Sequence, residues 1–452
     1  MSNEPDFFAH LRAELSGWRN WLDRAIVLAY AIAAGGFVVV FTWLAEWASG
    51  GFARLFEQHP LGVLLVTPLL TAGIVWCTRR WAPAAAGSGI PQVKAALDPA
   101  LPPAGRHLFV SLRLSLAKMA LAIAGFAAGL SIGREGPSVQ VAAGVMQHAR
   151  RWLSAGTSID SRGLLLAGGA AGIAGAFNAP LAGVVFAIEE LSGRIESRAS
   201  GLIITAIVLA GLVAVSFFGN TSYFGVIRAP GLGWEALGPG LAVAIACGLA
   251  GGLFSRLLIA SITAVPERLT LWRQRYPVLF AALCGLAIAV IGLATGGATF
   301  GSGSEAVKQM LQGHVELTPL ITLLKFVATW LCAWCGVPGG IFAPSLSIGA
   351  GLGNAFSWML DASLRPALIA LGMASFLAAV TRAPLTAFII VMEMVDGHAM
   401  VLSLMAAAML ASLISRMITR PLYDTVAEHM VAPVLAAAGP ARLPSGARPT
   451  PD

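Results

Sequence analysis

Long apolar runs separated by short polar segments make up most of this chain. Five windows carry no charged residue at all, and these are residues 25–45, 61–78, 200–219, 278–301 and 399–415. Each approaches or exceeds the roughly 18 apolar residues that mark a helix able to cross a bilayer. The pattern therefore predicts several membrane-spanning helices.

The two ends of the chain have a different pattern. Residues 1–24 are polar and amphipathic, with Phe7, Leu11 and Leu15 at helical spacing, and they do not resemble a cleavable signal peptide. We expect them to form a cytoplasmic amphipathic helix on the membrane surface. Residues 432–452 are rich in Ala, Pro and Gly, and we expect a disordered cytoplasmic tail there.

The chain also repeats itself. Three pairs of segments resemble each other in the same order and at a nearly constant offset, namely 86–94 with 300–308, 133–138 with 339–345, and 178–189 with 382–393. One such match could arise by chance among Gly- and Ala-rich helices, but three in order indicate two homologous halves. We predict halves at 25–219 and 235–431, joined by a loop at 220–234. Repeats with Gly- and Pro-interrupted apolar segments point to a transport site near the middle of the membrane.

Composition and charge narrow the class of protein. Only 11% of the residues are charged and 57% are hydrophobic, whereas about a quarter of the residues of a soluble protein are charged. The net charge is +7, and arginines cluster beside the apolar runs, for example at Arg79 and Arg80. The positive-inside tendency favours cytoplasmic termini. No contiguous basic domain exists, which argues against a nucleic-acid partner.

Cysteine and histidine give no sign of a metal or cofactor. All five cysteines lie in apolar segments, and the CxxC spacing of Cys332 and Cys335 falls inside a hydrophobic run without a second pair. We interpret these cysteines as packing residues. The seven histidines are scattered without metal-ligand spacing. We therefore expect no metal site and no cofactor.

Three motifs break the apolar runs with glycine and proline. They are GSGIP at 87–91, GREGP at 133–137 and GIFAP at 340–344. Glycine allows close approach of the backbone, and proline suits the first turn of a helix. Helix N-termini that converge on one point form an anion site from N–H dipoles. Such a site holds an anion without a full positive charge, so that the anion can also leave.

Glu135 is the unusual residue of the second motif. A carboxylate at membrane depth is unfavourable by roughly 2.5–3.5 kcal/mol and is usually functional. Its position predicts a side chain that competes with an anion for the same site. The alternative is a buried ion pair between Glu135 and its neighbour Arg134.

These motifs resemble those of the CLC family of chloride channels and chloride/proton antiporters. The resemblance covers about residues 25–430 and includes the late Tyr423. It implies an all-α polytopic membrane protein with two inverted-topology repeats of tilted and broken helices. It also implies transport rather than enzyme activity, a homodimer with one pore per subunit, and a place in the lipid bilayer, here the bacterial inner membrane.

The resemblance implies a role for each site residue. Ser88 and Tyr423 would offer hydroxyls to a central chloride ion, and the backbone amides of Ile341 and Phe342 would complete the site. Glu135 would be the external gate and would also transfer protons. A helix cap is the alternative for Ser88, and an interfacial aromatic anchor is the alternative for Tyr423.

Glu190 is the second acidic candidate. Its neighbour Glu189 aligns with Glu393 in the second half, which predicts a shared structural task for those two residues, whereas Glu190 aligns with Met394. The family resemblance implies that Glu190 is the internal proton-transfer glutamate. This favours an antiporter over a passive chloride channel. The alternative for Glu190 is a solvated helix end paired with Arg194.

A few residues and one other class of function stay open at this stage. Lys118 is open between raising the potential for an anion and pairing with an acid, and Lys325 is a candidate for snorkelling toward the interface. Gln92 replaces an acidic residue that is often found after this proline, with unclear effect. An intramembrane serine hydrolase built on Ser88 would need a nearby base, and His107 lies at a charged end of a run.

Overall fold

The computed structural model describes residues 18–157, 159–192, 200–219, 223–224, 234–263, 267–315 and 317–438. Within these ranges every regular element is a helix, which confirms the predicted all-α class. Seven helical segments of the described residues are long and apolar enough to cross a membrane. They are Trp18–Gln58, Pro60–Trp81, Pro103–Ala127, Gly201–Phe218, Trp234–Thr263, Pro277–Ala294 and His398–Ile418.

The first half of the chain holds a series of helices between Trp18 and Phe218. These are α2 (Trp18–Gln58), α3 (Val63–Trp81), α4 (Ile90–Leu97), α5 (Leu112–Ala127), α6 (Glu135–His148), α7 (Ser161–Ala176), α8 (Pro180–Phe186) and α9 (Ser200–Phe218). A π-helical turn, η5 (Ala187–Ser192), extends α8.

The second half repeats this order. Its helices are α10 (Leu237–Thr263), α11 (Glu267–Arg275), α12 (Pro277–Ala294), α13 (Ser304–Leu311), α14 (Pro319–Cys335), α15 (Phe342–Ala355), α16 (Arg365–Thr381), α17 (Pro384–Val395), α18 (Val401–Ile418) and α19 (Leu422–Ala438). The short helices α4 and α13 both have 8 residues, and α6 and α15 both have 14. The repeat seen in the sequence is thus a repeat of helices.

Backbone conformation repeats along with helix length. Gly87 and Gly89, before α4, have φ angles of 72° and 114°, and their counterparts Gly301 and Gly303, before α13, have 63° and 82°. Glycine adopts such angles far more readily than other residues. The same turn therefore leads into the short helix of each half.

The two halves exchange equivalent contacts. The carboxylate of Glu189 accepts hydrogen bonds from the backbone N–H groups at the start of α17, and the carboxylate of Glu393 accepts them from the start of α8. Gly133 and its counterpart Gly340 pair in an antiparallel bridge. Equivalent residues can meet reciprocally in this way only across an approximate two-fold axis. The contacts thus agree with the predicted inverted repeat, and the shared task of Glu189 and Glu393 is helix capping.

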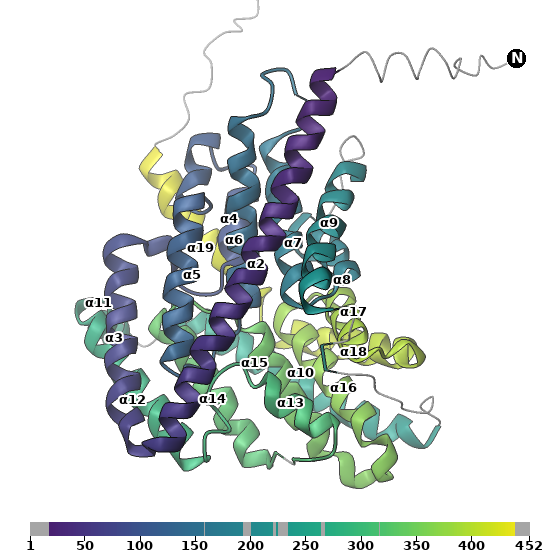
Figure 1. Ribbon diagram of the computed structural model, residues 1–452. Coiled ribbons are helices and arrows are strands. Elements are labelled where there is room, and N and C mark those ends of the chain that lie inside the picture. Colours follow the sequence, from purple (N-terminus) through teal and green to yellow (C-terminus); the bar gives the residue numbers. More distant parts are fainter. Residues whose placement is uncertain are drawn as a thin grey trace, which may run out of the picture.

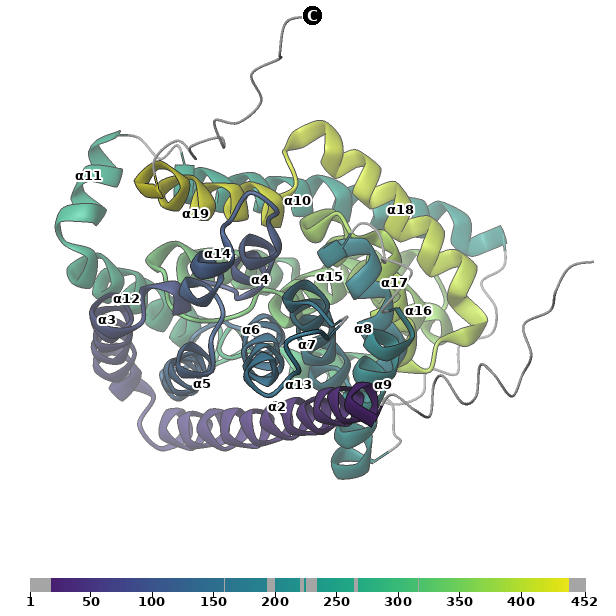
Figure 2. The ribbon, with the colours of Figure 1, turned by 90° about the horizontal axis from the view of Figure 1, so that it is seen from above.

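The helices that carry the motifs lie inside the molecule. In the view from above, α6 and α7 of the first half and α15 of the second half are central, while α2 runs along the front and α10 and α18 along the back (Figures 1 and 2). The residues of α7 from Gly163 to Ala176 are all buried. Its glycines allow this, because a side chain on Gly168 or Gly172 would collide with the backbone of α6.

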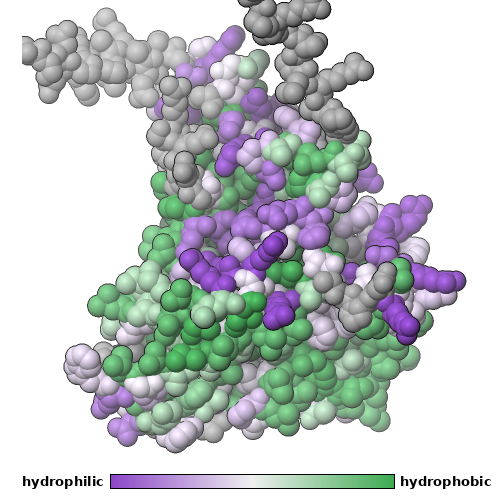
Figure 3. All heavy atoms as spheres, turned by 180° about the vertical axis from the view of Figure 1, so that it is seen from behind, coloured by the Kyte–Doolittle hydropathy of each residue, from purple (hydrophilic) through white to green (hydrophobic). Residues whose placement is uncertain are grey.

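The outside of the molecule is apolar over wide areas. The face seen from behind has a broad hydrophobic surface in its lower part and a band of hydrophilic residues above it (Figure 3). On α18, Leu402 and Met417 are 75% and 84% exposed. Large apolar side chains in such positions fit a surrounding of lipid rather than water.

Two predicted boundaries need correction. Residues 18–24 belong to the long helix α2 and do not form a separate surface helix, while residues 1–17 lie outside the described residues. The predicted disordered tail is wrong for residues 432–438, because α19 continues to Ala438. Val434 and Leu435 pack against the main hydrophobic core, which holds this last turn in place. The rest of the tail and most of the predicted loop at 220–234 lie outside the described residues.

Candidate functional site

The three glycine-containing loops meet at one place. The backbone N–H of Gly133 donates to the carbonyl of Gly340 at 2.7 Å, and the N–H of Gly340 donates back to Gly133 at 2.7 Å. The loop of Ser88 joins them, since the N–H of Gly87 donates to Val337 and the N–H of Gly339 donates to Gly87. The N-termini of α6 and α15 are therefore brought together, as the motifs predicted, with the loop before α4 beside them.

Close approach explains the glycines. A side chain on Gly89 would collide with the carbonyl oxygen of Gly136, and one on Gly136 would collide with Oγ of Ser88. A side chain on Gly133 would collide with the carboxylate of Glu135. The loops thus pass each other with no room for a methyl group at these positions.

Glu135 lies between the two helix N-termini. It is the first residue of α6 and is 2% exposed. Its Oε2 accepts a hydrogen bond from the backbone N–H of Ala343 in the first turn of α15, at 3.3 Å. The carboxylate thus occupies a position where the dipoles of α6 and α15 favour negative charge.

Arg134 does not neutralise Glu135. Its Nη1 pairs with the carboxylate of Glu46 on α2 at 2.7 Å, and its Nη2 donates to the hydroxyl of Tyr223 at 3.0 Å. The alternative prediction, a buried Glu135–Arg134 ion pair, is therefore wrong. Arg134 instead links α6 to the outer part of α2.

Ser88 and Tyr423 place two hydroxyls beside the loops. Both hydroxyl oxygens are buried and close enough to interact with each other, and neither makes a hydrogen bond of standard geometry among the described residues. Tyr423 is 2% exposed, so the alternative of an interfacial anchor is wrong. The cap of α4 also receives no side-chain hydrogen bond, which removes the alternative role of Ser88 as a helix cap. Buried hydroxyls without partners are unfavourable, and an anion would satisfy them.

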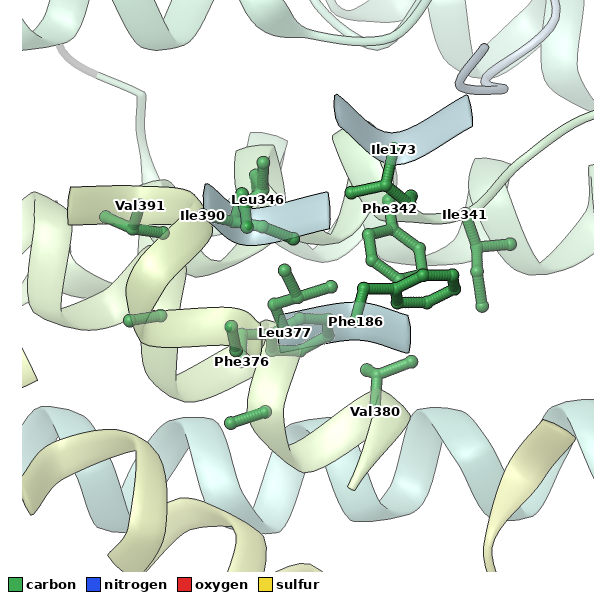
Figure 4. Close-up of a cluster of buried hydrophobic side chains, with 14 of the residues drawn as sticks. Ile173, Phe186, Ile341, Phe342, Leu346, Phe376, Leu377, Val380, Ile390 and Val391 are labelled. Atoms are coloured by element: carbon green, nitrogen blue, oxygen red, sulfur yellow. The ribbon is translucent and has the colours of Figure 1, made fainter. Parts of the chain in front are cut away.

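Ile341 and Phe342 begin α15. As the N-cap and first residue of a helix, they carry N–H groups that have no intrahelical acceptor. The Phe342 ring is stacked on Tyr423, with centroids 6.3 Å apart and an angle of 15°, and it also contacts Phe177 and Phe186. Figure 4 shows Phe342 and Phe186 within a cluster of apolar side chains from several helices. This packing fixes the position of the Tyr423 ring relative to the N-terminus of α15.

A cavity of about 620 Å³ leads to Ser88, Tyr423 and Ile341. Arg79 and Arg273 also line it. Burial lowers the pKa of Arg273 from its ordinary value, and the nearby positive charge of Arg79 adds to this effect. Two arginines side by side give the cavity a positive potential that attracts anions.

Two buried lysines donate hydrogen bonds to loop carbonyls instead of forming salt bridges. Nζ of Lys118 donates to the carbonyls of Ala85 and Gly87, and Nζ of its counterpart Lys325 donates to those of Thr299 and Gly301. Pairing of Lys118 with an acid is therefore not what the structure has. Snorkelling of Lys325 is also wrong, because the residue is 2% exposed and directed to a buried loop.

Gln92 fixes the same loop. Its Nε2 donates to the carbonyls of Ala84 and Ala86, at 3.2 and 2.6 Å. Nε2 of Gln140 donates to Ala84 as well. An acidic side chain has no N–H to donate in this way. The side-chain amide of Gln92 thus donates hydrogen bonds to backbone carbonyls just before Ser88 in the chain.

Glu190 lies in the π-helical turn η5 and is 8% exposed. Its Oε1 pairs with Nζ of Lys94 on α4 at 2.7 Å, and the same Nζ pairs with Oδ1 of Asp424 on α19 at 2.6 Å. The alternative of a solvated helix end is wrong, because the carboxylate is buried and paired. Arg194, its suggested partner, lies outside the described residues. Single π turns are frequent at functional sites.

Sequence reasoning missed Lys94 and Asp424. Lys94 recurs as Lys308 in the second half, so the different surroundings of the two lysines could not be seen from the sequence. In the structure, Lys308 is exposed. Asp424 directly follows Tyr423, but nothing in the chain signals that α19 lies against α4. The pairing depends on long-range packing and is visible only in the fold.

The family is decided by a match over most of this architecture. The family model described as voltage gated chloride channel matches residues 70–416, which is more than half of the chain. The chain belongs to this voltage-gated chloride channel family. The predicted membership is thereby confirmed.

Named relatives give detail within the voltage-gated chloride channel family. The chain is similar to the H(+)/Cl(−) exchange transporter ClcA of Klebsiella pneumoniae subsp. pneumoniae, with 29% identity over 406 residues, or 86% of this chain and 84% of the relative. A relative from Citrobacter koseri with the same description is also 29% identical over 406 residues.

Solved structures of the family share the fold. A slow cyanobacterial Cl−/H+ antiporter has a TM-score of 0.72 and 26% identity, covering 92% of this chain and 98% of that chain. A CLC-type fluoride/proton antiporter has a TM-score of 0.73 at 21% identity, covering 93% and 99%. The second likeness shows the fold alone.

Proposed function

We propose that this chain is a secondary active antiporter that exchanges chloride for protons. One observation carries the proposal: a carboxylate, Glu135, lies between the N-termini of α6 and α15, where an anion would also be bound. The relatives described as exchange transporters support it. They also favour transport over an intramembrane hydrolase built on Ser88.

Glu135 would serve as gate and proton carrier in one side chain. When ionised, it competes with chloride for the helix dipoles and blocks the path. When protonated, it loses that attraction and leaves the position to an anion. Each exchange of a carboxylate for chloride would therefore involve one proton at Glu135.

Chloride would be held on the cavity side of Glu135 by neutral hydrogen-bond donors. The hydroxyls of Ser88 and Tyr423 and the first N–H groups of α15, at Ile341 and Phe342, are the available groups. Their number favours binding, and the absence of a full positive charge in direct contact favours release.

Glu190 would be the second proton site. Glu190 is buried and acidic, and the matching position of the other half holds Met394 instead of an acid. A passive chloride channel would have no use for a second buried carboxylate away from the loops. Channel activity is nevertheless the alternative that the experiment below must exclude.

We further propose the orientation, location and assembly of the protein. Arg79 and Arg273 at the cavity support a cytoplasmic position for this side by the positive-inside tendency, and both termini would lie there, with Glu135 toward the outside. The protein would reside in the bacterial inner membrane as a homodimer, as the family resemblance implies. Each subunit would have its own pore, because one chain holds every group of the site.

The test is flux in liposomes that contain the purified protein and a chloride gradient. We expect the gradient to drive protons uphill in the wild type. Glu190→Gln should abolish proton movement and retain chloride flux, because it removes only the second proton site. Glu135→Gln should also abolish proton movement and make chloride flux less dependent on pH, because the amide does not ionise.

Glu305→Gln is the matched control, since Glu305 is an exposed residue on α13. It should leave both fluxes unchanged. Chloride flux without uphill proton movement in the wild type would establish the channel alternative. Coupling that persists in Glu190→Gln would remove this residue from the proton path.

A further inference from the structure

Lys94 is placed between two carboxylates that belong to different parts of the protein. Its Nζ lies 2.7 Å from Oε1 of Glu190 in η5 and 2.6 Å from Oδ1 of Asp424 on α19. The side chains of Lys94 and Glu190 are only 13% and 7% exposed, whereas that of Asp424 is 52% exposed. The lysine thus bridges a buried acid and an accessible one.

The bridge has no equivalent in the other half. Lys308 stands at the position of Lys94 but is exposed, and Met394 stands at the position of Glu190. Asp424 lies on α19, which follows the last repeated helix. The charges are therefore not part of the repeated scaffold, unlike Lys118 and Lys325, which hold equivalent loops in both halves.

The arrangement suits an acid that changes its protonation. Removing one partner of a buried ion pair leaves an uncompensated charge, which is strongly unfavourable. When Glu190 binds a proton, Lys94 still has Asp424 as a partner. Lys94 therefore keeps an ion pair in both states of Glu190, and the proton can bind and leave without stranding an ammonium group.

Asp424 is also the neighbour of Tyr423. Tyr423 is stacked on Phe342 at the start of α15, so the first turn of α19 forms one wall of the anion site. A change in how strongly Lys94 pulls on Asp424 acts directly on this turn. The bridge thus connects Glu190 with the turn that carries the cavity-lining Tyr423.

We propose that Lys94 is a positioning residue for proton transfer, which divides its charge between Glu190 and Asp424 and so links protonation of Glu190 to the helix of Tyr423. This inference rests on the proposed function of Glu190. Among the described residues, the other ionisable groups near Glu190 are Glu189 on the same turn and Tyr423 on α19. Glu189 is engaged in capping α17, and Lys94 is the cation that pairs with Glu190 among the described residues.

Removing Lys94 or Asp424 should change the pH dependence of Glu190 in opposite directions. In Lys94→Met the ionised form of Glu190 loses its cation, so Glu190 should keep its proton to higher pH. In Asp424→Asn the whole charge of Lys94 acts on Glu190, so Glu190 should bind a proton only at lower pH. A purely structural role of these residues would not shift the two profiles in opposite directions.

The experiment measures chloride-driven proton flux in liposomes against pH. For Lys94→Met we expect proton flux at neutral pH to fall about fivefold or more, with chloride flux changed less than about twofold, and the pH profile to move in the alkaline direction. For Asp424→Asn the profile should move in the acid direction. Lys94→Arg should keep the wild-type profile, because arginine retains the positive charge. Lys308→Met, the matched control, should also leave the profile unchanged.

The outcomes separate this inference from the proposed function. A coupled wild type and an uncoupled Glu190→Gln, together with unshifted profiles in Lys94→Met and Asp424→Asn, would overturn the role of Lys94 alone. Shifts in the same direction would do so as well. A wild type without proton coupling would overturn the proposed function and this inference with it. If Lys94→Met fails to fold, Asp424→Asn and Lys94→Arg still decide the direction of the shift.

Discussion

At the scale of single residues, the site combines one carboxylate with neutral hydrogen-bond donors. Glu135 carries the charge, and its carboxylate touches the backbone N–H of Ala343. Ser88 and Tyr423 contribute buried hydroxyls that make no hydrogen bond of standard geometry among the described residues. Lys118 donates to the carbonyls of Ala85 and Gly87 in the loop before Ser88 and not to the hydroxyls. An anion therefore finds attraction without a permanent ion pair.

Tyr423→Phe isolates the contribution of one hydroxyl. The phenyl ring keeps its stacking on Phe342, so the packing is preserved while one donor to the anion is lost. A hydrogen bond to a charged group contributes about 1.5–3 kcal/mol, so chloride affinity should fall about tenfold or more. Isothermal titration of chloride into the purified protein measures this change.

Tyr276→Phe serves as the matched control for the tyrosine variant. Tyr276 is 45% exposed and lies outside the site, at the start of α12. It should bind chloride as the wild type does. An unchanged affinity in Tyr423→Phe would contradict a direct contact between its hydroxyl and the anion.

At the scale of elements, helix ends decide the geometry. The N-termini of α6 and α15 are turned toward each other by the mutual hydrogen bonds of Gly133 and Gly340. The N-termini of α8 and α17 are instead capped by carboxylates from the opposite half. One pair of helix ends is thus left open for an anion, and the other pair is closed by protein.

The reciprocal caps should stabilise the protein without taking part in transport. Loss of a capping side chain costs about 0.5–2 kcal/mol. Glu189→Ala and Glu393→Ala should each lower the apparent melting temperature in detergent, and by similar amounts, because their contacts are equivalent. Glu305→Ala, an exposed control, should not. A variant of either cap with the stability of the wild type would contradict the capping role.

At the scale of the whole molecule, the approximate two-fold axis explains why the site lies at the centre. Equivalent loops of the two halves meet at Gly133 and Gly340, so the helix ends from both sides converge on one point. The apolar outer surface then matches the lipid, as Figure 3 shows for one face. Departures from symmetry, in Glu135, Glu190 and α19, make the two ends of the site different from each other.

The proposed orientation can be tested with single cysteines in a variant that lacks the five natural ones. His429 lines the cavity beside Ser88. Glu57 lies near the C-terminal end of the long helix α2. We expect a membrane-impermeant thiol reagent to label Glu57→Cys in intact cells. His429→Cys should react only after permeabilisation. The reverse pattern would contradict cytoplasmic placement of the cavity.

Several features follow from the sequence alone. Uncharged runs predicted the membrane helices, because a bilayer requires apolar side chains over a fixed length. Glycine and proline predicted where helices begin and where loops approach each other, because these residues restrict the backbone locally. Repeated motifs predicted the two halves, and the motifs placed Ser88 and Glu135 at the central loops.

Contacts between distant segments were decided only by the tertiary structure. The sequence did not reveal that Lys94 bridges Glu190 and Asp424, or that Lys118 and Lys325 bind loop carbonyls. It also placed the end of α19 in a disordered tail. A charged residue in an apolar run shows that a partner is needed, but the partner depends on which helices come together. Local pattern therefore determined the elements and the kind of site, and long-range packing determined which side chains complete it.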